Sequence, residues 1–337
     1  MDPDQLGIVI GTIATAIGVF VAWRQARFHR HYTRGEERVA APRRHEQWAQ
    51  LAASWAGDGR SASLRGAELQ GENLRDIDLG PADGRSQGAD LAFGNLAGAN
   101  LQYGRLIGVN LQGSTLQDAN LAHANLQGAN LLGVNLKNAN LENANLQGAN
   151  LLGATLEGAN LISTSLEGAY LGNADLRRTG LIGARLQGAD LVHANLEATV
   201  LVDANLEGAK LISANLREAR LWNANLQDAN LLNANMREAD LWSANLQGAA
   251  LWGANLQEAK LQNAALTDAI LAGADLRHAD LQRANLRGAD LRGANLDEAR
   301  LNSAWYSHST RWPDGFTPPY AAANLDLRFH RATNGDS

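Results

Sequence analysis

Leucine occupies every fifth position through most of this chain. The spacing holds from Leu91 to Leu301 with Met236 as the single substitution, and it also links Leu64 to Leu79. Five residues rotate a helix by a net angle of about 140°, which would spread the leucines around the whole cylinder. A straight strand would alternate them between its two faces, because five is odd. Only a chain that bends once per five residues keeps them on one side, so the pattern predicts a coil wound around its own leucines.

The other positions of each pentapeptide fit this interpretation. The common unit is Ala-Asn-Leu-x-x, as in residues 144–148. The alanine lies two residues before the leucine, so both point inward in a short extended segment. The last position is often Gly or Asn, which supply the positive φ of a type II turn. The bend is therefore predicted directly after each leucine.

The residues that follow the leucines indicate how many pentapeptides close one coil. Between positions 132 and 252, every tenth residue is mostly apolar, whereas the interleaved positions from 137 to 247 are all polar. A three-sided coil would spread this alternation over every face, but a four-sided coil keeps it as two apolar and two polar walls. Four sides give twenty residues per coil, and the array then makes about twelve coils.

One segment interrupts the period. Leu79 and Leu91 are twelve residues apart instead of ten, so residues 80–90 are expected to form an irregular corner loop with two extra residues. The repeat array is expected over 61–305 and a C-terminal cap and tail over 306–337. The segment Thr310–Phe316, with Trp305, Tyr306 and Tyr320 nearby, is expected to seal the last coil.

The unit A-N/D-L-x-x, which persists for more than forty repeats over 61–305, resembles the pentapeptide-repeat family. The stretch TRWPDGF, from Thr310 to Phe316, also resembles a segment that often follows such arrays. The resemblance implies an all-β solenoid, a right-handed quadrilateral β-helix, with the handedness coming from the family alone. Some members of this family resemble B-DNA in shape and charge and bind topoisomerases.

The N-terminal region is of a different kind. After a short tail, residues 1–5, the stretch Leu6–Trp23 carries no charge and would be about 27 Å long as a helix, close to the thickness of a bilayer core. A retained membrane anchor is favoured over a cleaved signal peptide, because the tail is acidic. Arginines follow Trp23 directly, so we expect a single-pass protein of the inner (cytoplasmic) membrane with its N-terminus outside and the repeats in the cytoplasm.

Residues 24–60 are expected to form a basic linker followed by a short amphipathic helix. Trp48, Leu51 and Trp55 are spaced by three and four residues, which places them on one helical face. Two interpretations remain open for this helix. It either caps the first open coil, as repeat arrays require, or lies in the membrane interface with its tryptophans in the headgroup layer.

Composition argues against several classes of function. The formal net charge is -6, from 29 Lys and Arg against 35 Asp and Glu, and a nucleic-acid partner would usually require a basic face. There is no cysteine, and the histidines of the array fall on different walls, where they cannot converge on a metal. A solenoid filled by leucine has no cavity for a substrate. We therefore expect no catalysis, no cofactor and no nucleic-acid partner.

Four apolar residues form the candidate protein-binding site. Trp222 and Trp242 are twenty residues apart and should stack on one wall, and Leu232 and Trp252 should do so on the opposite wall. Ordered apolar surface and tryptophan are both typical of binding sites, although such stacks can also serve only to stabilise adjacent coils. The sequence predicts a membrane-anchored scaffold for an unknown protein partner. The alternative is a DNA-mimicking protein that binds and protects a topoisomerase (gyrase).

Self-association is a further expectation. Small residues spaced by four in Leu6–Trp23 would let two membrane helices approach closely, and two opposite apolar walls would let rods lie side by side. The sequence leaves open which of these would form a homo-oligomer.

Overall fold

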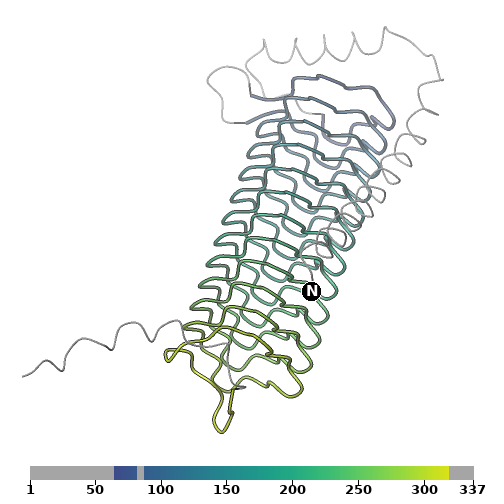
Figure 1. The fold of residues 1–337 in the computed structure, drawn as a ribbon. Coiled ribbons are helices and arrows are strands. Elements are labelled where there is room, and N and C mark those ends of the chain that lie inside the picture. Colours follow the sequence, from purple (N-terminus) through teal and green to yellow (C-terminus); the bar gives the residue numbers. More distant parts are fainter. Residues whose placement is uncertain (1–63, 82–86, 319–337) are drawn as a thin grey trace, which may run out of the picture. The chain divides into compact units, whose positions relative to one another are not determined.

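The computed structural model describes residues 64–81 and 87–318, which form one stack of coils (Figure 1). Within these residues there is no helix, and regular pairing consists of single parallel bridges, one per pentapeptide. From Asp90 to Trp305 the bridged residues are twenty positions apart, as in the pair of Asn130 with Asn150. Four pentapeptides therefore complete one coil, as the alternation of apolar and polar positions predicted.

The leucines fill the axis of the stack. From Leu91 to Leu291 each leucine of the five-residue series, and Met236, is at most 1% exposed, and the alanines two residues earlier are buried with them. Burying a leucine side chain contributes roughly 1.5–3 kcal/mol, so this axis is the main source of stability. Where threonine replaces the alanine, its hydroxyl remains bonded: Thr199 Oγ1 donates to the carbonyl of Leu176 at 2.8 Å.

The chain bends directly after each leucine. In one typical turn, the N–H of Ala149 donates to the carbonyl of Leu146 at 3.0 Å. The second residue after the leucine has a positive φ, between 53° at Asn223 and 71° at Gly158. Both features match the predicted turn. Many of these positions hold Glu, Arg, Ser or His, so the coil imposes this conformation on residues that seldom adopt it.

Asparagine recurs before the leucine because it completes the hydrogen bonding of the backbone. In the pentapeptide 145–149, four N–H groups donate to backbone carbonyls at 2.7–3.0 Å, three of them in adjacent coils. The fifth, that of Gln147, donates to Oδ1 of Asn145 at 3.0 Å. The amide can also reach the neighbouring coil, since Nδ2 of Asn245 donates to Oδ1 of Asn225 at 2.9 Å. No N–H group of this pentapeptide is left unbonded.

The expectation of two extra residues at 80–90 is wrong. Before this loop the bridged residues are 27 positions apart, as in Asp78 with Arg105, and after it Asp90 pairs with Asn110 at the usual twenty. Only one wall, not two, thus separates Asp78 from Asp90, and seven residues are looped out. The turn still closes, because the N–H of Ala89 donates to the carbonyl of Leu79 at 2.8 Å. Leucine spacing alone could not distinguish these two solutions.

The last coils extend past position 305. Asp290 is bridged to Arg311, with one extra residue in the coil, and Thr310 Oγ1 donates to the carbonyl of Leu286 at 2.8 Å. Tyr306 packs against the core, with its ring centre 5.3 Å from that of Trp312. Trp305 instead pairs through its backbone and is 41% exposed. Tyr320 lies outside the described residues.

The N-terminal expectations also lie outside the described residues. These are the short tail, the membrane helix Leu6–Trp23, and the linker with its amphipathic helix over 24–60. In the part of the chain that the structure describes, no helix has the length and apolar character needed to cross a membrane.

Candidate protein-binding walls

Two opposite walls of the stack carry the candidate residues. The Trp222 wall comprises the pentapeptides centred on Leu221 and its equivalents at twenty-residue intervals. The Trp252 wall comprises those centred on Leu251 and its equivalents. The two sets are ten residues, or half a coil, apart, so they face in opposite directions.

Trp222 and Trp242 lie in successive coils of the Trp222 wall, since the carbonyl of Trp242 accepts a hydrogen bond from the N–H of Asn223 at 3.1 Å. Both side chains are half-buried. The guanidinium of Arg220 lies 5.4 Å from the ring centre of Trp222, and Nε1 of this tryptophan is buried without a hydrogen-bond partner. Neighbouring side chains therefore cover part of this tryptophan pair.

Leu232 and Trp252 lie in successive coils of the Trp252 wall, and here more apolar surface is free. Trp252 is 53% exposed, whereas Leu232 is half-buried. Ile270, which is 45% exposed, is bridged to Ala250 and so lies one coil further along the same wall. Trp252 and Ile270 thus expose large apolar side chains in neighbouring coils of the same wall.

Two further exposed residues of the Trp252 wall lie nearer the N-terminal end. Leu152 is 43% exposed and Tyr170 is 56% exposed. Sequence reasoning missed Tyr170, Ala250 and Ile270, because it followed only the residues after the leucines. These three precede a leucine, where asparagine is the rule. The replacement of asparagine by an apolar residue was the signal that could have identified them.

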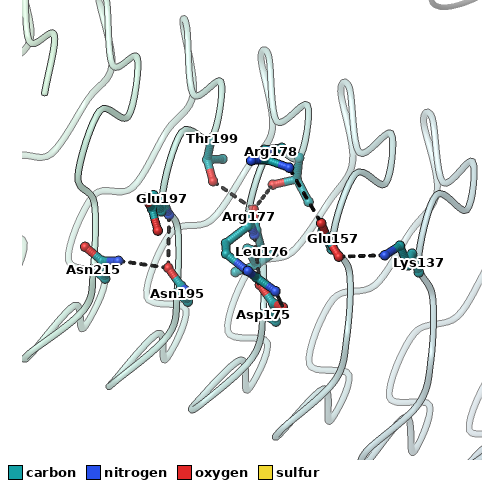
Figure 2. A network of polar contacts seen from close by, with 11 residues as sticks. Lys137, Glu157, Asp175, Leu176, Arg177, Arg178, Asn195, Glu197, Thr199 and Asn215 are labelled. Carbon is teal, nitrogen blue, oxygen red and sulfur yellow. Dashed lines mark hydrogen bonds and ion pairs between the residues drawn. The ribbon is translucent and has the colours of Figure 1, made fainter.

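The wall between them, called here the Arg177 wall, comprises the pentapeptides centred on Leu176 and its equivalents at twenty-residue intervals, and most of its charged side chains form ion pairs (Figure 2). Lys137 Nζ lies 2.8 Å from a carboxylate oxygen of Glu157 in the next coil, and Arg177 lies 2.6 Å from Asp175 in its own coil. The hydrogen bond from Lys137 holds the pKa of Glu157 below its ordinary value. The hydrogen bond from Arg177 does the same for the pKa of Asp175. Signs largely alternate along the wall, although Arg217 and Arg237 follow each other, and this differs from the uniform charge of a phosphate backbone.

The fourth wall, called here the Gln187 wall, comprises the pentapeptides centred on Leu186 and its equivalents at twenty-residue intervals, and it is largely made of neutral amides and glycines. Gln127 Nε2 donates to Oε1 of Gln147 in the next coil at 3.4 Å. Within residues 64–81 and 87–318, no group of three or more His, Asp or Glu side chains is arranged to hold a metal ion.

The sequence matches the family described as "Pentapeptide repeats" with eight copies. The matched segments cover more than half of the chain: residues 105–143, 139–178, 181–217, 204–242, 214–253, 234–271 and 269–304. Among curated proteins, none matches the sequence.

Several solved structures are similar. HetL, a pentapeptide repeat protein involved in heterocyst differentiation regulation in the cyanobacterium Nostoc, is 33% identical with a TM-score of 0.37, and the alignment covers 75% of this chain and 94% of HetL. A pentapeptide repeat protein of the Arabidopsis thaliana thylakoid lumen is 30% identical over 32% of this chain and 71% of its own, with a TM-score of 0.27. QnrB1, a plasmid-mediated fluoroquinolone resistance protein, is 17% identical over 74% of this chain and 93% of its own, with a TM-score of 0.29. On the repeats matched along most of its coils, this chain belongs to the pentapeptide-repeat family and has that family's right-handed quadrilateral β-helix fold.

Proposed function

We propose that this protein is a non-catalytic scaffold that binds a protein partner through its apolar walls. The observation that carries the proposal is the exposure of Leu152, Tyr170, Trp252 and Ile270, each more than 40% exposed, on the Trp252 wall. Large apolar groups gathered on one surface are typical of protein contact sites, and tryptophan is enriched at their centres. The coil pairing beneath them is continuous, so this surface is held flat and rigid.

Catalysis is not part of the proposal. The interior is filled by leucine and alanine along its whole described length, which leaves no enclosed space for a substrate. The family match names a repeat, and no catalytic family is indicated. Binding through the outer walls is the role that this architecture supports best.

The proposal includes the membrane anchor. The uncharged stretch Leu6–Trp23 and the arginines after it support a single span, with the repeats in the cytoplasm. Protease treatment of inverted and intact membrane vesicles tests this topology. Repeats that are digested only in inverted vesicles would support it, and repeats released by an alkaline wash would contradict it.

The binding test compares the two apolar walls. The full chain is used to capture partners from native membranes, as wild type, as the pair Trp252→Ser with Ile270→Ser, and as Trp222→Ser. We expect the double variant to lose capture at least tenfold while its circular dichroism is unchanged. Unchanged capture by the double variant would show that the exposed patch has only a structural role.

A DNA-mimicking role is the alternative that the resemblance suggests. The paired charges of the Arg177 wall, such as Lys137 with Glu157, do not support it, because exposed pairs of opposite sign cancel at a distance. A gyrase supercoiling assay with the purified chain tests it. Inhibition at stoichiometric concentrations would favour this alternative over the scaffold.

A further inference from the structure

We propose that the Trp252 wall binds a second copy of this chain in antiparallel orientation. The two-fold axis would cross the wall midway between Asp190 and Lys210, perpendicular to the stack. This inference rests on the proposed function, in that it uses the same apolar wall, and it names the partner. Three columns of side chains, each with one residue per coil, point to the same axis.

The first column contains the residues directly after the leucines, from Gln112 to Arg292 in steps of twenty. Its ends are polar and its middle is almost entirely apolar, with its midpoint between positions 192 and 212. An antiparallel copy brings Leu152 opposite Trp252, so the most exposed apolar groups of this column cover each other. It also brings Gly172, which has no side chain, opposite Leu232.

The second column lies at the corner of the wall, from Gly113 to Gly293 in steps of twenty. Its order is three glycines, Asn, His, then Ser, Asn and three glycines, which is a near palindrome about the same midpoint. Glycines therefore flank both Leu152 and Trp252. A Cβ atom added at Gly133 or Gly153 would meet no other atom within 4 Å, so the corner there is low and open. At Gly253, which faces Gly153 of the second copy, an added Cβ atom would lie 2.5 Å from Oδ1 of Asn233, so there the asparagine side chain covers the corner and would face the open corner at Gly153.

The third column, which precedes the leucines, carries the charges. Asp190 and Lys210 are bridged neighbours on either side of the midpoint, and Lys210 is exposed. In the antiparallel pair each Asp190 faces Lys210 of the second copy, which gives a ring of four charges of alternating sign. At the ends of the wall, Asp90 faces Arg311 of the second copy.

These charges also fix the register. Sliding the second copy by one coil moves the axis by half a coil, and it places Asp190 opposite its own copy in one direction and Lys210 opposite its own copy in the other. A parallel pair would instead place Asp190 against Val192 and Lys210 against Ile212. Burying a charge against an apolar group is unfavourable, so the antiparallel register is preferred.

The wall is large enough for a specific contact. Eleven coils at a spacing of about 4.8 Å give a length of about 50 Å, and three extended residues give a width of about 10 Å. Each copy then contributes about 500 Å², and a pair buries about 1,000 Å², which reaches the lower limit for a specific interface. A closed pair of this kind uses the same surface twice, as two-fold interfaces do.

Charge reversal tests the axis. Sedimentation of the purified full chain should show a dimer. Asp190→Lys and Lys210→Asp should each raise the dissociation constant of this dimer at least tenfold. The combined variant Asp190→Lys with Lys210→Asp should restore dimerisation, because every facing pair again has opposite sign. A monomeric wild type would overturn the proposal, as would single variants that dimerise like the wild type.

Cross-linking tests the orientation of the two copies. The chain has no native cysteine, so only the introduced thiols can react. Asn150→Cys and Ala250→Cys are prepared separately, mixed, and treated with a bismaleimide that spans about 10 Å, the distance between facing sheets. The antiparallel pair predicts links between the two different variants. Links of each variant with itself alone would overturn it.

The two tests separate this inference from the proposed function. A monomeric wild type that still captures a different protein through Trp252 and Ile270 contradicts the dimer and leaves the scaffold intact. A dimer that obeys the charge reversals supports this inference, whether or not a further protein is captured.

Discussion

The asparagines before the leucines provide a graded test of what holds adjacent coils together. Asn145, Asn225 and Asn245 lie on the Gln187 wall, are half-buried, and share the context Ala-Asn-Leu-Gln. Among the described residues, the side chain of Asn145 makes one hydrogen bond, to the N–H of Gln147. Replacement of each asparagine by alanine therefore removes a different number of bonds from nearly identical surroundings.

The other two asparagines make more bonds. Asn245 accepts from the N–H of Gln247 at 3.1 Å and donates to Asn225 at 2.9 Å. Asn225 accepts from the N–H of Gln227 and from Asn245, and donates to Asn205 at 3.1 Å. At a net value of about 1 kcal/mol per bond, the alanine variants at 145, 245 and 225 should lose about 1, 2 and 3 kcal/mol.

Guanidinium unfolding followed by circular dichroism measures these losses in the free energy of unfolding, provided that its dependence on denaturant concentration is the same in all variants. The variant Asn225→Asp is the control, since it keeps an oxygen for Gln227 and for Asn245 but removes the donor to Asn205. It should lie between wild type and Asn225→Ala. Equal losses at all three alanine sites would show that only the bond to the backbone N–H contributes, and would refute the role of the amide contacts between coils.

Three other predictions concern the core, the charged wall and the turns. Leu146→Ala should destabilise the protein by about 2–5 kcal/mol and Leu152→Ala by less than about 1 kcal/mol in the same unfolding assay, because only the first leucine is fully buried. Arg177→Met should raise the pKa of Asp175 toward its ordinary value of 3.8, as read by NMR titration. Since the folded pKa is lowered, this pair stabilises the protein above the unfolded pKa, and the variant should lose less stability as the pH falls through the folded value. Gly188→Val should cost about 1–2 kcal/mol, because valine resists the positive φ of 63°, whereas Gly188→Asn should cost less.

The coil itself could be predicted from the sequence because the sequence contains two independent periodic patterns. The leucine period of five determined the core, and the alternation after the leucines determined the number of walls. Both survive substitution, as at Met236, since they depend on side-chain volume and polarity rather than on identity. The role of asparagine was not predicted, because it depends on hydrogen bonds to a backbone whose path was not yet known.

Only part of the candidate surface could be predicted from the sequence. The pairing of Trp222 with Trp242 followed from spacing, but the position of Arg220 near the ring depends on side-chain geometry. Ile270 was missed because an apolar residue before a leucine was interpreted as a departure from the repeat consensus, where asparagine is usual, and not as part of an exposed surface. Whether these residues bind a partner remains a prediction.

The spacing of bridged residues has a consequence for how such chains can change length over evolutionary time. The interior repeats every five residues, but the exterior repeats only every twenty. Deleting one pentapeptide between Leu232 and Trp252 would keep every later leucine inside and turn all later surface residues by a quarter of a circle, which would place Trp252 and Leu232 on different walls. Insertions and deletions of twenty residues preserve both patterns, so selection on surface contacts should favour gain or loss of whole coils.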